Sequence, residues 1–182
     1  MEMPLPNHIL TLHDVWMDPL DPHPQDICID DIAHALSFLT RANGHFKHFY
    51  SVAQHCLNCE TEAAARGFDR DTRLFCLLHD AAECYLSDLT RPVKCRFPLY
   101  DEAERRLQGI IFTALCRGSI PTVQSWQQVG EVDDCLLAQE FWNLRGVLLV
   151  DPLPVMCGDC DFQTREMAQV EELFLKRYRA LS

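Results

Sequence analysis

The chain has 182 residues, of which 48% are hydrophobic and 24% are charged, and its formal net charge is −11 at pH 7. This composition is typical of one globular domain, and the acidic balance removes the usual electrostatic basis of nucleic-acid binding. No apolar run reaches the length of about 18 residues that a membrane span needs, and the first residues lack the basic-then-apolar pattern of a signal peptide. We therefore expect a cytoplasmic protein that does not cross a membrane.

The first 27 residues are rich in proline, which predicts an extended arm with a short hairpin. From residue 28 onward, apolar residues recur at helical spacing, and no segment alternates as a strand would. Predicted helices cover residues 30–42, 51–67, 71–86, 100–117, 123–145 and 163–181, with loops over 43–50 and 150–161. The sequence thus predicts an all-α bundle of about six helices in a single domain over residues 1–182. Its parts are the irregular N-terminal arm (1–27), a core (28–146) and a C-terminal loop and helix (147–182).

Ten cysteines are present, and four of them form two Cys-x-x-Cys pairs, Cys56/Cys59 and Cys157/Cys160. Because no export signal is visible, we do not expect disulfides. One hypothesis is a zinc-thiolate interaction module that joins the two pairs. The other is a set of reduced cysteines used as small core residues, which is favoured because the first pair lies inside a helical pattern.

His79 and Asp80 are adjacent in an otherwise apolar stretch, and Glu83 follows within one helical turn. A buried face that collects these groups requires a cation or raised pKa values, whereas a solvated surface helix would not. The flanking apolar residues favour burial. All eight histidines lie at or before position 79, so a site using later residues would mix imidazole with carboxylate, as Mn, Co, Mg, Zn and Fe sites do. Taken alone, His55 is more typical of a buried core histidine than of a ligand.

Three blocks, DPLDPHPQDICIDDIAHALSFLTRANGH, FYSVAQH and LLHDAAECYLSDLTRPVK, follow one another from residue 18 onward. In this order they resemble the HD superfamily of metal-dependent phosphohydrolases, in particular small bacterial and phage HD-domain proteins related to 5′-deoxyribonucleotidases. The resemblance implies an HD-domain helical bundle whose core binds one divalent metal ion through His55, His79, Asp80 and an Asp on a later helix. Val132-Asp133 followed by LLAQE matches the family's register, so Asp133 is the implied fourth ligand and Asp134 is the alternative.

The resemblance also implies roles around the ion. Glu83 is the implied residue that orients or deprotonates the attacking water, and Asp88 the one that protonates the leaving group. Arg41 and Lys94 are the implied phosphate contacts. His45 follows as a contact to phosphate or leaving group, with a loop-fixing hydrogen bond as the alternative. Where deoxyribonucleotidase relatives often carry Trp after the arginine, this chain has Ala42.

The function implied by the resemblance is hydrolysis of the 5′-phosphate of (deoxy)nucleoside monophosphates. Few Lys and Arg residues lie near the motifs, which favours a monophosphate over a triphosphate. Three alternatives stay open: a deoxynucleoside triphosphate triphosphohydrolase, a cyclic-nucleotide or other phosphodiesterase, and a catalytically silent nucleotide sensor. The expected partner is a small-molecule nucleotide, with no nucleic acid and no membrane. The resemblance implies a homodimer, in which Trp126 and Trp142 would line either the interface or the core.

Overall fold

The computed structural model describes residues 6–182. Its strands and 3₁₀ turns are β1 (Ile9–Leu10), β2 (Trp16–Met17), η1 (Pro24–Asp26) and η2 (Arg41–Gly44). Its α-helices are α1 (Ile29–Phe38), α2 (Val52–Ala65), α3 (Arg70–Leu78), α4 (Glu83–Leu86), α5 (Arg91–Lys94), α6 (Pro98–Leu115), α7 (Val123–Arg145) and α8 (Met167–Leu181). The all-α prediction is confirmed. None of the helices described is both long and apolar enough to cross a membrane.

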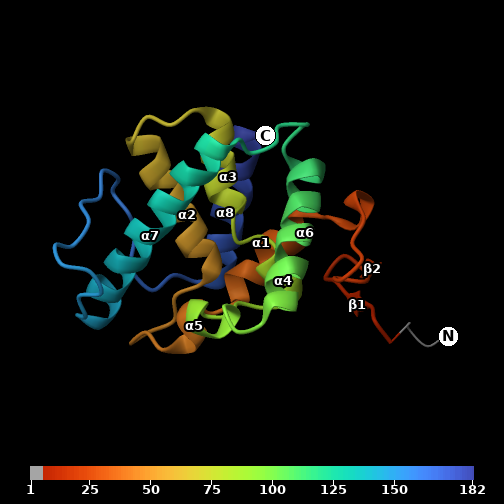
Figure 1. Cartoon of the computed structure of the whole chain (residues 1–182), viewed down its shortest axis with the longest axis horizontal. Coiled ribbons are helices and arrows are strands. Elements are labelled where there is room, and N and C mark those ends of the chain that lie inside the picture. The colour runs from red at the N-terminus through yellow and green to blue at the C-terminus, as the bar shows by residue number, and fades with distance from the viewer. Residues whose placement is uncertain (1–5) are drawn as a thin grey trace.

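The bundle is organised around α2, which packs against α1, α3, α7 and α8 (Figure 1). One continuous apolar core joins these helices, and its fully buried members include Leu36, Leu77, Leu136 and Phe174. Each such side chain contributes roughly 1.5–3 kcal/mol through burial. A second, smaller cluster of Phe46, Tyr50 and Leu144 packs beside it. Because α2 is enclosed on several sides, its side chains can meet residues from distant parts of the chain.

Both ends of α7 follow local sequence signals. Thr122 Oγ1 accepts a hydrogen bond from the backbone N–H of Ser125 at 3.1 Å, and Ser125 Oγ accepts one from the N–H of Thr122 at 2.7 Å. Gly146 ends the helix in the left-handed conformation, at φ 69°. Such caps satisfy backbone groups that a helix end leaves free. The predicted helix over residues 123–145 is confirmed.

The predicted helix over residues 71–86 is wrong as a single element, because it is broken between Leu78 and Glu83. In a continuous helix the N–H of Ala82 would donate to the carbonyl of Leu78. Here the side-chain amide of Gln108, on α6, bonds both groups: its Oε1 accepts from Ala82 N at 3.0 Å, and its Nε2 donates to Leu78 O at 2.7 Å. His79 and Asp80 therefore lie in the turn that follows α3, not on a helical face.

The predicted helix over residues 30–42 is also too long. It ends at Phe38, after which Thr40 pairs with Ser51 in an isolated antiparallel bridge. The N–H of Arg41 donates to Tyr50 O at 2.9 Å. Arg41 thereby lies beside the start of α2, where the Ser51 side chain caps the helix by accepting a hydrogen bond from Gln54 N.

The N-terminal arm and the C-terminal loop lie at opposite ends of the longest axis (Figure 1). The predicted hairpin is confirmed as β1 paired with β2. The C-terminal loop, here named the strap (residues 146–166), is longer than predicted, and α8 starts at Met167 instead of residue 163. Polar side chains along α2 hold the strap: Gln54 bonds Gln163 O, Asn58 bonds the backbone of Asp161, and Glu62 accepts from the N–H groups of Cys157 and Gly158.

Candidate functional site

Four side chains from three parts of the chain converge on one point. His55 comes from α2, His79 and Asp80 from the turn after α3, and Asp133 from α7. His55 Nε2 lies 3.2 Å from both His79 Nε2 and Asp133 Oδ1. Asp80 Oδ2 lies 3.4 Å from His79 Nε2 and 3.6 Å from His55 Nε2, and His79 Nε2 lies 3.8 Å from Asp133 Oδ1.

These separations fit a shared divalent cation. Two ligand atoms about 2.1 Å from one ion, at the angles of tetrahedral or octahedral coordination, lie roughly 3.0–3.4 Å apart. Two imidazole nitrogens and two carboxylate oxygens form a donor set suited to several divalent metals. The residues present therefore fit a metal ion.

Both imidazole rings are held by their other nitrogen. His55 Nδ1 lies 2.5 Å from Oε1 of Glu140, whose side chain is fully buried on α7. His79 Nδ1 lies 2.8 Å from the carbonyl oxygen of Cys76. Since both partners only accept hydrogen bonds, each Nδ1 carries a proton and each Nε2 faces the common point, where it can donate when the ring is charged and offers its lone pair to a cation when the ring is neutral.

The electrostatic field at this point favours positive charge. Burial lowers the pKa of His79, but Asp80 and Asp133 overcome it and raise the pKa well above its usual value. Burial raises the pKa of Asp133, but hydrogen bonds from His55 and His79 outweigh it and hold the pKa well below its ordinary range. Arg41 adds further charge: its guanidinium lies 3.2 Å from Asp80, 3.3 Å from Asp133 and 3.4 Å from Glu140.

Two further carboxyl groups lie close to this cluster. Glu83 is 3% exposed, and burial together with Asp80 and Asp88 raises its pKa well above the usual range. Its Oε2 has no hydrogen-bond partner among residues 6–182. Burial is also the main cause of a raised pKa at Asp88. The turn between them is fixed by the Tyr100 hydroxyl, which donates to Ser87 O.

The other predicted site residues differ in their placement. Lys94 Nζ bonds Glu104 at 2.7 Å, within electrostatic range of Glu83 and Asp80. The side chain of His45 is exposed at the end of η2, and its backbone carbonyl accepts from Arg145 at 2.7 Å. No contact described for residues 6–182 joins the ring of His45 to the four ligands. Asp134 is 65% exposed and bonds Arg91 at 2.9 Å, whereas its neighbour Asp133 faces the cluster.

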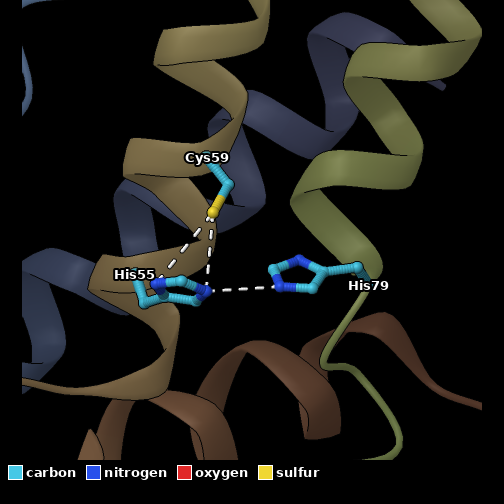
Figure 2. Close-up of side chains that lie close together, drawn as sticks. All are labelled: His55, Cys59 and His79. Atoms are coloured by element: carbon cyan, nitrogen blue, oxygen red, sulfur yellow. Dashed lines mark hydrogen bonds between the residues drawn. The ribbon is translucent and has the colours of Figure 1, made fainter. Parts of the chain in front are cut away.

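Sequence reasoning missed two residues of the cluster. Cys59 Sγ lies 3.5 Å from His55 Nε2, one turn further along α2 (Figure 2). Its i+4 spacing from His55 was the available signal. Glu140 shares a helical stripe with Asp133, but nothing local in the sequence pairs it with His55.

The two Cys-x-x-Cys pairs do not form one site. Besides the cluster of His55, His79, Asp80 and Asp133, the described His, Cys and acidic side chains that could hold a metal form the groups His55/Cys59/His79, Cys56/His79/Asp80 and His13/Cys28/Asp31. Cys157 and Cys160 join none of them. The zinc-thiolate module therefore lacks the four-thiol site that it needs.

No family model matches the chain. An uncharacterized protein of Rhodobacter capsulatus is 45% identical over 178 residues, which cover 91% of this chain and 90% of that protein. Uncharacterized protein YfdR of Escherichia coli is 40% identical over 86 residues, covering 47% of this chain and 46% of that protein. Since the first similarity extends over nine tenths of both sequences, the chain belongs to the same family as the Rhodobacter capsulatus protein.

Proposed function

We propose that this protein is an HD-type phosphohydrolase that uses one divalent metal ion to hydrolyse the 5′-phosphate of (deoxy)nucleoside monophosphates. The observation that carries the proposal is the convergence of His55, His79, Asp80 and Asp133, with both imidazoles held on Nδ1. Asp80, Asp133 and Glu140 carry three negative charges against the one positive charge of Arg41, so a divalent cation would balance the remaining charge of this buried donor set. The order of sequence blocks that resembles the HD superfamily supports the same reading.

His55, His79, Asp80 and Asp133 would hold the ion, with Mn, Co, Mg, Zn and Fe as the candidate metals. When bound, such a cation supplies Lewis-acid polarisation of a phosphoryl oxygen and lowers the pKa of a water molecule. Glu140 and the Cys76 carbonyl keep the two rings in the orientation that binding requires. Second contacts of this kind are a regular part of metal sites.

The surrounding residues would transfer protons and stabilise charge on the phosphate. Glu83 has one buried carboxyl oxygen free of partners in the described chain, so it can orient the attacking water and accept its proton. Asp88 follows on the next turn and can return a proton to the departing sugar oxygen. Arg41 is largely buried against the carboxylates and can stabilise charge on the phosphoryl oxygens. Lys94 can contribute a second positive charge beside the phosphoryl oxygens.

The proposed substrate class rests on the small number of basic side chains near the cluster that are free of carboxylate partners. Arg41, Arg91 and Lys94 are the nearby basic side chains, and each is paired with at least one carboxylate. A triphosphate would need more positive charge than three partly neutralised groups provide. We therefore favour a monophosphate, and we treat a triphosphate, a phosphodiester and a silent sensor as outcomes of the test.

The test measures phosphate release after chelation and re-addition of each metal, with nucleoside mono- and triphosphates as substrates. Orthophosphate from monophosphates alone supports the proposal, and tripolyphosphate from deoxynucleoside triphosphates would replace it with a triphosphohydrolase. Asp133→Asn should abolish both metal binding and turnover. Asp134→Asn is the matched control and should retain both, because Asp134 faces solvent. Full activity in Asp133→Asn would sink the ligand assignment.

A further inference from the structure

A second group of metal-ligand side chains lies where the N-terminal hairpin meets α1. His13 belongs to the loop between β1 and β2, Cys28 is the N-cap of α1, and Asp31 lies in the first turn of that helix. One ligand atom from each lies within 4.8 Å of the others. This hairpin cluster (His13, Cys28 and Asp31) shares no residue with the four-ligand cluster described above.

Asp31 is the unusual member. Its side chain is only 3% exposed, yet Oδ2 has no hydrogen-bond partner among residues 6–182. The other oxygen, Oδ1, accepts two hydrogen bonds from His13: one from the backbone N–H at 3.0 Å and one from the ring Nδ1 at 2.8 Å. A buried carboxylate with one idle oxygen is costly unless a cation or further donors compensate it.

His13 compensates Oδ1 of Asp31, but no group among residues 6–182 forms a hydrogen bond with Oδ2. Burial raises the pKa of Cys84 and of Tyr85, and Asp31 raises both further, so these neighbours are neutral. Among the three residues of this cluster, His13 can carry positive charge, and its side chain is 50% exposed. Oδ2 of the carboxylate therefore has a lone pair without a partner among residues 6–182.

Cys28 supplies the third ligand. N-cap positions favour Ser, Thr, Asp and Asn because their side-chain oxygens accept hydrogen bonds from the first helical N–H groups. Cys28 makes no such side-chain bond, and its thiol is free and half-buried. A thiolate, an imidazole and a carboxylate together form a donor set that suits zinc.

We propose that His13, Cys28 and Asp31 form a zinc site that fastens the N-terminal hairpin to the start of α1. On binding, the Cys28 thiol releases its proton to solvent, the His13 ring gives up its Nδ1–H bond to Asp31 and binds through one nitrogen with its proton on the other, and Asp31 provides a carboxylate oxygen. The thiolate and carboxylate together balance the charge of Zn²⁺, so the loaded site is neutral. Water completes the coordination from the solvent side, where His13 is exposed.

The site would hold a hairpin that already packs on the core. Met17 is 1% exposed, and Ile9 and Val15 pack against buried residues. Zinc binding adds a cross-link between residues 13 and 31, so it selects the docked arm over the released arm. This inference does not rest on the proposed phosphohydrolase activity, because its ligands are separate.

The experiment uses the full chain carrying Asp133→Asn, in which the four-ligand cluster is disabled. After chelation and dialysis, this protein should retain one equivalent of added Zn²⁺ per chain. Added Co²⁺ should give a thiolate-to-cobalt charge-transfer band. Cys28→Ser should abolish both the equivalent and the band. Cys59→Ser is the matched control for the thiol near His55, and Cys157→Ser for a thiol in the strap, and both should retain them.

Folding is controlled by the choice of substitution. Serine is a favoured N-cap, so Cys28→Ser should melt at the same temperature as the parent or higher in chelator. Zinc at 100-fold above its Kd should raise the Tm of the parent by about 5 °C and leave Cys28→Ser unchanged. No zinc retained by the Asp133→Asn protein, or a cobalt band that persists in Cys28→Ser, would overturn the site. Loss of activity alone would bear only on the proposed function.

Discussion

The two ligand clusters differ in how their side chains are held. The four-ligand cluster joins three helical regions, and each imidazole is anchored on its second nitrogen by Glu140 or by the Cys76 carbonyl. The hairpin cluster joins a loop and a helix only 18 positions apart, and His13 bonds the same carboxylate that would share its metal. The histidines of the first cluster are held by groups outside the ligand set, whereas His13 in the second is held by another member of its own cluster.

Under the two proposals, the four-ligand cluster would carry out a reaction, whereas the hairpin cluster would hold the N-terminal arm in place. Around the four-ligand cluster the chain places acids, a buried arginine and ring anchors in successive shells. In the hairpin cluster, by contrast, the side chain of His13 is half exposed to solvent. We expect chemistry at the first cluster and a purely structural effect at the second.

The largest expected effect comes from Glu83→Gln. Gln cannot accept a proton, so turnover should fall by roughly 10²–10⁴-fold, the usual range for an acid–base group. The metal content of the protein should not change, because Glu83 is not one of the four ligands. Steady-state phosphate release and metal analysis on the same sample test both statements. A loss of metal instead of turnover would show that Glu83 is a metal ligand and not an acid–base group.

Glu140→Gln tests the ring anchor. Since Gln no longer offers a carboxylate to His55 Nδ1, metal affinity should fall by about 10–100-fold, as is typical when a second contact of a metal ligand is removed. Competition with a metal indicator measures the change. Glu62→Gln is the control: Glu62 is equally buried but bonds the strap, so affinity should not change. Equal losses in both variants would show a general packing defect.

Sequence reasoning predicted the helices whose ends are determined by residues close to them in the chain. Thr122 and Gly146 delimit α7, and the prolines mark the arm, because capping and backbone restrictions act within a few residues. It failed at residues 79–82, where the apolar spacing continues but the helix does not. The cause is Gln108, 26 positions away from Ala82, and no local pattern contains it.

In the candidate site, too, residues with a local sequence signal could be predicted and residues that depend on distant partners could not. His79, Asp80 and Glu83 stand out because their charges interrupt an apolar segment. Glu140 does not, because a glutamate on a long helix is usually a solvated residue and its partner His55 lies 85 positions away. His13, Cys28 and Asp31 follow no ligand spacing, so only the docking of the hairpin brings them together.

Gln108→Met tests whether the side chain of Gln108 imposes the helix break between Leu78 and Glu83. Methionine keeps the volume but leaves Ala82 N–H without its acceptor and removes one of the two donors to Leu78 O, at a cost of about 1–3 kcal/mol for the buried polar groups. Urea unfolding should report this loss. Metal affinity should also fall, because the two groups can then pair with each other and move His79. Gln124→Met, at an exposed position of α7, is the control and should change neither quantity.

The smallest expected effect is on the mobility of the hairpin. The N–H of Thr11 donates to Val15 O, and the N–H of Asp14 donates to Thr11 O, so their exchange with deuterium reports the docked arm. Zinc at tenfold above its Kd should slow this exchange by about tenfold if opening the hairpin requires release of the metal. Amides of α2 around His55 should respond less, because the fold already holds that cluster. Hairpin amides that ignore zinc in the parent, or that respond equally in Cys28→Ser, would show that the hairpin is held without the metal, and the contrast between the two clusters would then disappear.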